Sequence, residues 1–164
     1  MDVNHDIALV AARAGKVLQA LGLLITTAES CTGGGIAQAL TEIPGSSQWF
    51  DCGFVTYSNA SKTSLLNVPE TLIALHGAVS EEVAAAMATG ALARAHAQVA
   101  VSVSGIAGPG GAVPGKPVGT VCFAYAARQL VHTETHHFSG DRHAIRTQAV
   151  IHALNRVLAF LEPA

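Results

Sequence analysis

Two short apolar runs, each followed by a glycine-rich turn, limit the possible folds of this chain more than any other feature. The first run is 23–28 (LLITTA), and the residues ESCTGGG lead from it into an apolar helical segment. The second is 98–105 (QVAVSVSG), which leads into the loop IAGPGGAVPGKPVG. In α/β sheets, ligands bind outside the carboxyl ends of such strands. We therefore expect both turns to border one anion-binding pocket, with Ser30 and Ser104 as hydroxyl donors.

The remaining segments complete a single layered domain over residues 1–164. Strand patterns at 51–59, 120–127 and 130–138 join the two buried runs, and the last two are separated only by Arg128 and Gln129, which predicts an antiparallel hairpin. Helical patterns alternate with these strands, at 5–21, 33–40, 80–97 and 140–161, with a short one that ends at Leu66 and another that Pro69 opens. The fold class that we predict is α/β, with a mixed parallel and antiparallel sheet flanked by helices.

Composition excludes several classes of function. The net charge is −2 and the basic residues are scattered, which argues against a nucleic-acid partner. No run of apolar residues is long enough for a membrane span, and the acidic N-terminus does not resemble a signal peptide. Three cysteines without paired spacing indicate reduced thiols and a cytoplasmic protein. Only 12% of the residues are charged, which suggests that self-association covers part of the surface.

The turn TAESCTGGG carries several reactive groups but matches neither GxxxxGK[ST] nor GxGxxG. Free N–H groups at a helix start attract anions, although the glycines could equally serve only to permit a tight turn. Cys31 at the helix start is a possible thiol nucleophile. A small buried cysteine is the commoner case and the one that we prefer.

The segment GSSQWFDCGFVTYSNASK adds two serines, Tyr57 and Lys62. A lysine whose pKa is lowered by partial burial can act as a general base for a serine, and a tyrosine can transfer a proton. However, the spacing fits neither Tyr-x-x-x-Lys nor Ser-x-x-Lys. The residues by themselves favour a solvated surface lysine.

The histidine-rich strand LVHTETHHF suggests a metal site. Alternation places His132, Glu134 and His136 on one face of the strand, which is a possible ligand set. A solvated strand face is more common, and we do not expect a metal here. At the last helix, Arg142 and Arg146 lie one turn apart, and Arg142 at the helix start is a reasonable phosphate ligand.

Six blocks of the sequence together resemble the CinA C-terminal-domain family, whose enzymatic members are nicotinamide-mononucleotide deamidases. The blocks occur in the family's order and cover nearly the whole chain: TAESCTGG, GSSQWFDCGFVTYSNASK, HGAVSEEVAAAMA, SVSGIAGPGG, KPVGTV and FSGDRHAIR. The resemblance implies a compact α/β domain with a mixed sheet, associating as a homodimer or higher homo-oligomer. It implies a cytoplasmic amidohydrolase of pyridine-nucleotide salvage that converts nicotinamide mononucleotide and water to nicotinic acid mononucleotide and ammonia.

The same resemblance suggests serine–lysine chemistry without metal or organic cofactor. Carried over to this sequence, it implies Ser47 as the nucleophile, Lys62 as its base and Tyr57 as an aid to proton transfer. Ser30 is the rival nucleophile. The positions implied for substrate binding or the oxyanion are Thr32, Gly33, Gly34, Ser104, Gly105 and Arg142.

Two departures from the family pattern limit these expectations. Some members carry a large N-terminal domain with nucleotide pyrophosphatase activity, which this sequence lacks, so that activity is not expected. An acidic residue often found in the family's second loop is replaced here by GGAVPG, and we expect 110–116 to be an unstructured loop. A catalytically silent nucleotide-binding or interaction module is the alternative to the deamidase, and Cys31 as nucleophile is a third hypothesis.

Overall fold

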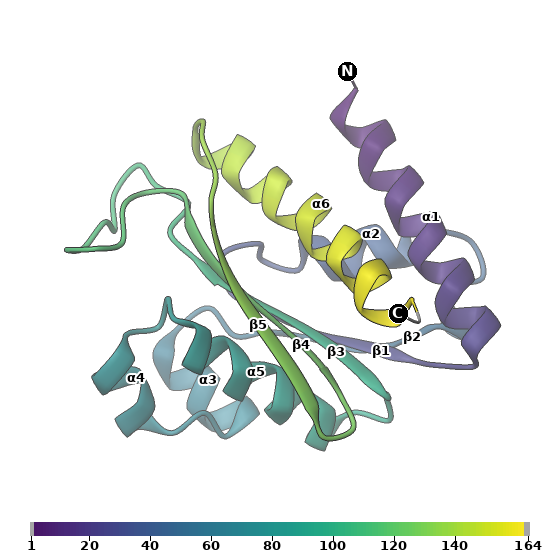
Figure 1. Cartoon of the computed structure of the whole chain (residues 1–164), viewed down its shortest axis with the longest axis horizontal. Coiled ribbons are helices and arrows are strands. Elements are labelled where there is room, and N and C mark those ends of the chain that lie inside the picture. Colours follow the sequence, from purple (N-terminus) through teal and green to yellow (C-terminus); the bar gives the residue numbers. More distant parts are fainter. Residues whose placement is uncertain (1, 163–164) are drawn as a thin grey trace.

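A five-stranded mixed sheet in the order β2-β1-β3-β4-β5 forms the centre of the structure, a computed structural model that describes residues 2–162 (Figure 1). The strands are β1 (Ile25–Glu29), β2 (Phe50–Val55), β3 (Val99–Gly105), β4 (Thr120–Ala127) and β5 (Leu130–His137). The helices are α1 (Val3–Leu21), α2 (Gly35–Thr41), α3 (Asn59–Leu66), α4 (Glu70–His76), α5 (Glu81–Arg94) and α6 (Arg142–Leu161), with a 3-10 turn at Ser46–Gln48. This confirms the predicted α/β fold with a mixed sheet.

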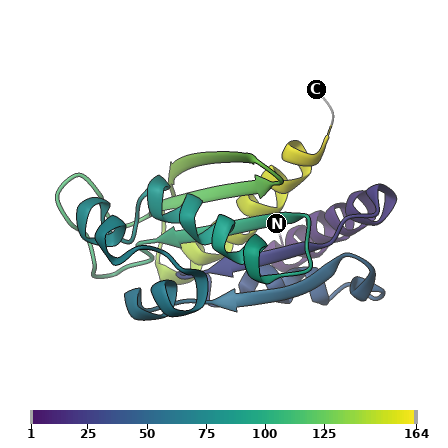
Figure 2. The same ribbon diagram turned by 90° about the horizontal axis from the view of Figure 1, so that it is seen from below.

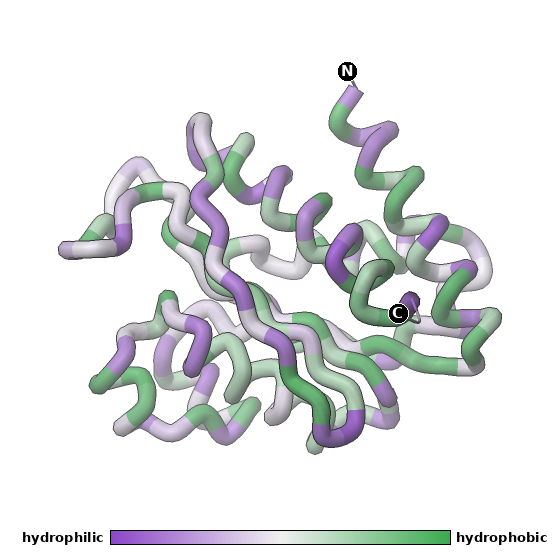
Figure 3. Tube along the Cα trace, viewed as in Figure 1, coloured by the Kyte–Doolittle hydropathy of each residue, from purple (hydrophilic) through white to green (hydrophobic). Residues whose placement is uncertain are grey.

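The helices form one layer on each face of the sheet. Helices α1, α2 and α6 cover one face, and α3, α4 and α5 cover the other (Figures 1 and 2). Each layer packs against its own cluster of buried apolar side chains. Every residue of β1 is buried, as expected for a parallel strand that is covered on both faces. The edge strand β5 is mostly exposed and carries hydrophilic residues along most of its length (Figure 3).

Strand β1 lies between β2 and β3, and the connections β1–β2 and β2–β3 run on opposite faces of the sheet (Figure 1). Strand β1 pairs in parallel with β2 on one side and with β3 on the other, whereas β4 and β5 continue the sheet in antiparallel fashion. The chain passes from β1 through α2 to β2, and then through α3–α5 on the opposite face to β3. In open α/β sheets such a reversal opens a crevice at the carboxyl ends of the two strands. The crevice therefore lies between the turns that follow β1 and β3.

Helix α3 packs directly on α5. A Cβ added to Gly90 of α5 would lie 2.0 Å from the carbonyl oxygen of Leu66, the last residue of α3. Only a glycine permits this approach of the two helices, since no Cβ could fit there. Because α3 also carries Lys62, this packing sets the depth of the lysine below the surface.

Two local expectations are corrected by the structure. The strand predicted at 51–59 ends at Val55, because Ser58 caps α3 and the chain must bend before it. Residues 110–116 are not unstructured, since Val113 and Lys116 form an isolated β-bridge and the Lys116 ammonium donates to the carbonyl of His76. Within residues 2–162, none of the helices combines the length and apolar character needed to span a membrane.

Candidate functional site

A pocket of about 280 Å³ occupies the crevice between the carboxyl ends of β1 and β3. Both glycine-rich turns border it, as the sequence predicts, and α3 and the start of α6 complete its wall. Six of the residues expected at the site line it: Ser30, Tyr57, Lys62, Ser104, Gly105 and Arg142. Ser47, Thr32, Gly33 and Gly34 do not.

Lys62 is the most unusual side chain of the pocket, because it is only 1% exposed. Its Nζ lies 3.1 Å from Ser30 Oγ, 2.9 Å from the carbonyl oxygen of Thr56 and 3.1 Å from that of Tyr57. None of the ion pairs found within residues 2–162 involves this ammonium. Burial therefore lowers the pKa of Lys62, while the nearby Cys31 opposes the shift.

The two carbonyl groups fix the direction of the lysine lone pair. A carbonyl oxygen can only accept, so a neutral Lys62 amine donates its two hydrogens to Thr56 and Tyr57. The remaining position around Nζ points at Ser30 Oγ, to which the protonated ammonium donates at 3.1 Å; in a neutral amine this position would hold the lone pair and accept from the hydroxyl instead. The arrangement is that of a general base oriented toward a serine.

The structure does not bring Ser47 and Lys62 together. Ser47 lies in the exposed 3-10 turn before β2, at the amino end of the strand, whereas Lys62 follows its carboxyl end. A strand of this length separates the two by roughly 16 Å, at about 3.3 Å per residue. The parallel register places the end of β1 beside the end of β2, and this is why Ser30 takes the position next to the lysine.

The side chain of Glu29 holds the turn that carries Ser30. This carboxylate is fully buried and accepts from the Thr32 hydroxyl at 2.6 Å and from the backbone N–H groups of Ile36 and Ala37 at 2.8 and 3.0 Å. An acidic side chain at a helix start is favoured by the free N–H groups there. Thr32 therefore positions the turn rather than facing the pocket.

Arg146 secures the same turn from the other side. Its guanidinium donates to the carbonyl oxygens of Cys31 at 3.0 Å and Thr32 at 3.3 Å. Gly33 and Gly34 have φ angles of 60° and 97°, so their part is to permit the turn. Sequence reasoning missed the roles of Glu29 and Arg146, although an acid directly after a buried strand and before a helix start is a detectable signal.

The second turn supplies the opposite wall of the pocket. The Ser104 hydroxyl donates to the carbonyl of Ala78 at 2.7 Å, which ties β3 to the segment before α5. A Cβ on Gly105 would lie 2.8 Å from Val121 Cγ2 and 3.1 Å from Cys31 Sγ, so this position accepts no side chain without a shift of its neighbours. Gly110 and Gly111, from the loop that was expected to be unstructured, also line the pocket.

Arg142 and Tyr57 form the rim. The Arg142 guanidinium donates to the carbonyl of Gly108 at 2.8 Å and to the Tyr57 hydroxyl at 3.3 Å. Arg142 is the first residue of α6, whose N-cap Asp141 accepts from the N–H of Ala144. The Tyr57 ring is 60% exposed, so it is available to a ligand that enters the pocket.

Cys31 lies at the pocket but is not an activated thiol. It is buried, and burial raises its pKa to about 12. A thiol of this kind stays protonated at neutral pH and is a poor nucleophile. The site thus contains a serine hydroxyl, a buried lysine amine in contact with it, and a cationic rim.

The fold and the pocket define an α/β domain that pairs a serine with a buried lysine at the switch point of a mixed sheet. The chain belongs to the CinA C-terminal domain family, whose model matches residues 8–161. A relative from Pseudomonas putida, named nicotinamide-nucleotide amidohydrolase PncC, is 54% identical over 152 residues, which cover 93% of this chain and 95% of that protein.

Other similar proteins carry different names. A putative competence-damage inducible protein from Symbiobacterium thermophilum is 53% identical over 90% of this chain, which spans only 37% of that longer protein. The crystal structure of the competence/damage inducible protein CihA from Agrobacterium tumefaciens superposes with a TM-score of 0.93 at 46% identity, covering 96% of both chains.

Proposed function

We propose that this protein hydrolyses the carboxamide of nicotinamide mononucleotide to give nicotinic acid mononucleotide and ammonia, with Ser30 as nucleophile and Lys62 as its base. The chain is an amidase that acts on a non-peptide amide. The observation that carries the proposal is the 3.1 Å contact between Lys62 Nζ and Ser30 Oγ, with both other positions of the amine taken by carbonyl oxygens. The printed name of the Pseudomonas putida relative supports the reaction.

The proposed reaction has two halves. Lys62 takes the hydroxyl proton while Ser30 Oγ attacks the amide carbon, and the tetrahedral intermediate collapses as the lysine returns the proton to the departing ammonia. Water then attacks the acyl-serine with Lys62 again as base, which releases the carboxylate and restores the hydroxyl. Cys31 is the residue after the nucleophile, and within the described residues its backbone N–H makes no backbone hydrogen bond in the sheet or in α2. This N–H is therefore the proposed oxyanion donor.

Arg142 and the start of α6 provide the proposed site for the 5′-phosphate. A guanidinium binds phosphate through two parallel N–H bonds, and the N–H groups at a helix start add to the attraction. The exposed Tyr57 ring beside Arg142 offers a surface for the pyridinium or ribose. We further propose a homodimer that acts in cytoplasmic pyridine-nucleotide salvage, for which the low charge content and the free cysteines are the support.

An ammonia-release assay on purified protein tests the proposal. Nicotinamide mononucleotide should be turned over, and nicotinamide riboside, which lacks the phosphate, should require a much higher concentration. Ser30→Ala should lower kcat by at least about 1,000-fold, the usual effect of removing a nucleophile. Ser47→Ala is the matched control, because Ser47 lies at the amino end of β2, away from the pocket. This variant should retain full activity.

Two results would contradict the proposal. Binding of the mononucleotide without any ammonia release would favour the silent binding module. Loss of activity in Ser47→Ala with full activity in Ser30→Ala would restore the residue assignment that the family resemblance implies.

A further inference from the structure

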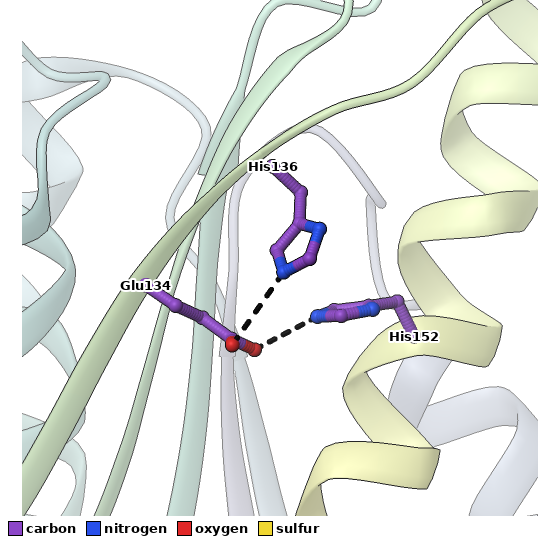
Figure 4. A group of neighbouring side chains, drawn as sticks. All are labelled: Glu134, His136 and His152. Atoms are coloured by element: carbon purple, nitrogen blue, oxygen red, sulfur yellow. Dashed lines mark hydrogen bonds and ion pairs between the residues drawn. The ribbon is translucent and has the colours of Figure 1, made fainter.

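A second cluster of reactive side chains lies on the face of β5 that α6 covers. Glu134 and His136 project from β5, and His152 reaches them from α6 (Figure 4). The strand pattern suggests His132, Glu134 and His136 as a ligand set, but His152 replaces His132 in the cluster that forms. Sequence alternation cannot reveal this substitution, because it depends on how the helix crosses the sheet.

The three side chains present their ligand atoms to a common point. His152 Nε2 lies 2.8 Å from Glu134 Oε1 and His136 Nε2 lies 3.5 Å from Glu134 Oε2, and the ligand atoms of all three lie within 4.8 Å of one another. In a tetrahedral zinc site, bonds of about 2.0–2.1 Å place the ligand atoms about 3.4 Å apart. Small side-chain rotations therefore convert the hydrogen-bonded cluster into a two-histidine, one-carboxylate site.

The surroundings already orient the carboxylate. Tyr125 donates its hydroxyl to Glu134 Oε1 at 3.0 Å, and Arg156 donates Nε to the same oxygen at 3.2 Å. The other carboxylate oxygen, Glu134 Oε2, faces His136. Outer hydrogen bonds of this kind fix the ligands of protein metal sites. The Phe123 ring packs on His152, with centroids 4.8 Å apart, and limits the freedom of that imidazole.

The pKa values of His152 and Glu134 are both lowered. Burial lowers the pKa of His152, although its bond to Glu134 opposes the shift. Burial would raise the pKa of Glu134, but hydrogen bonds from His152 and Tyr125 and the charge of Arg156 outweigh it, so this pKa is lowered.

The geometry points to a binding site for a divalent transition-metal ion, formed by Glu134, His136 and His152, that joins α6 to β5. A single carboxylate with two imidazoles does not suit Ca²⁺ and Mg²⁺, which rely on oxygen ligands. Zn²⁺, Ni²⁺ and Cu²⁺ bind imidazole well and are the ions that fit. Glu134 and His152 are 17% and 18% exposed, so water has access to complete the coordination.

The site is separate from the Ser30–Lys62 pocket. His152 lies ten residues after Arg142 on the same helix, which is roughly 15 Å at about 1.5 Å per residue. An ion here would fix the helix whose first turn forms the pocket rim. Its expected effect is on stability and not on the chemical step.

The test is a Zn²⁺ titration of tag-free protein, after EDTA treatment and dialysis, by isothermal calorimetry and thermal unfolding. One ion per chain should bind and raise the melting temperature. His152→Gln should weaken binding by at least about 100-fold, whereas His137→Gln, on the exposed face of β5, should leave it unchanged. Arg156→Gln should tighten binding, because it removes the opposing charge.

Co²⁺ provides an independent readout, since tetrahedral coordination gives an intense visible absorption that octahedral coordination lacks. Circular dichroism of each variant confirms that it is folded. Equal Zn²⁺ binding by wild type and His152→Gln, or no binding at millimolar Zn²⁺ by folded wild type, would overturn the proposal. Ammonia release measured with and without Zn²⁺ separates its failure from that of the proposed function.

Discussion

At the scale of single residues, the orientation of the Lys62 amine makes activity depend on pH in a defined direction. The base must be neutral, so kcat/KM should rise with pH. It should be half-maximal at the pKa of Lys62 in the free enzyme and level off above it. Since burial lowers this pKa, the midpoint should fall below 10.5, the ordinary value for lysine.

Lys62→Arg is the control for that profile. The guanidinium stays protonated and has no lone pair to offer, so this variant should lose at least about 100-fold in kcat at every pH, the low end for a general base. A pH profile unchanged in Lys62→Arg would show that another group is the base.

Cys31 provides a second prediction at this scale. With a pKa raised to about 12 by burial, the thiol should contribute nothing as a nucleophile. We expect Cys31→Ala to keep kcat within about threefold of wild type, and iodoacetamide to inactivate the enzyme slowly. Loss of activity equal to that of Ser30→Ala would support the third hypothesis instead.

The residue scale also shows where sequence reasoning succeeded and where it failed. The residues by themselves favoured a solvated lysine at position 62, and its place in the pocket followed only from the family resemblance, but the serine, the tyrosine and the two glycine turns were predictable from their local patterns. The choice between Ser30 and Ser47 was not, because it depends on the parallel register of β1 and β2. No local pattern in the sequence shows which strand ends lie side by side in the sheet.

At the scale of elements, the contact between α3 and α5 controls the position of Lys62. Alanine normally stabilises a helix over glycine by about 1 kcal/mol. At Gly90, however, the new Cβ would lie 2.0 Å from the Leu66 carbonyl, so α3 must move. Gly90→Ala should therefore destabilise the fold by about 1–3 kcal/mol, as overpacking does, and lower kcat through the shift of Lys62.

Urea denaturation and ammonia release measure both effects. Thr89→Ala, at the exposed neighbouring position of α5, is the control and should change neither. If the Gly90→Ala variant were stabilised and fully active, α3 would accommodate the new Cβ without displacing Lys62.

The elements themselves were predicted well, since buried strands, a serine helix cap and the β4–β5 hairpin all have local signals. The spacing of the glycines predicted two turns but not the different role that each turn has in the pocket. The first turn holds a serine through the buried Glu29, and the second forms a wall. That difference arises from tertiary contacts that have no counterpart in spacing.

At the scale of the whole molecule, the pocket draws on β1, β3, α3 and α6 together. No part of it is confined to one layer, so we expect activity and far-UV circular dichroism to be lost at the same urea concentration, as in a two-state transition. Activity lost at clearly lower urea would show that the pocket opens before the domain unfolds.

The distribution of the catalytic pair along the chain has a consequence for biosynthesis. Lys62 and the carbonyls that orient it come from residues 56–62, whereas Ser30 follows another strand, and the two meet only when β1 and β2 have paired. Parallel pairing across a long connection forms slowly compared with helices and hairpins. Under the proposed mechanism, Ser30 is therefore an ordinary alcohol in the nascent chain on the ribosome, and we expect its hydroxyl to become reactive only after the pocket has formed.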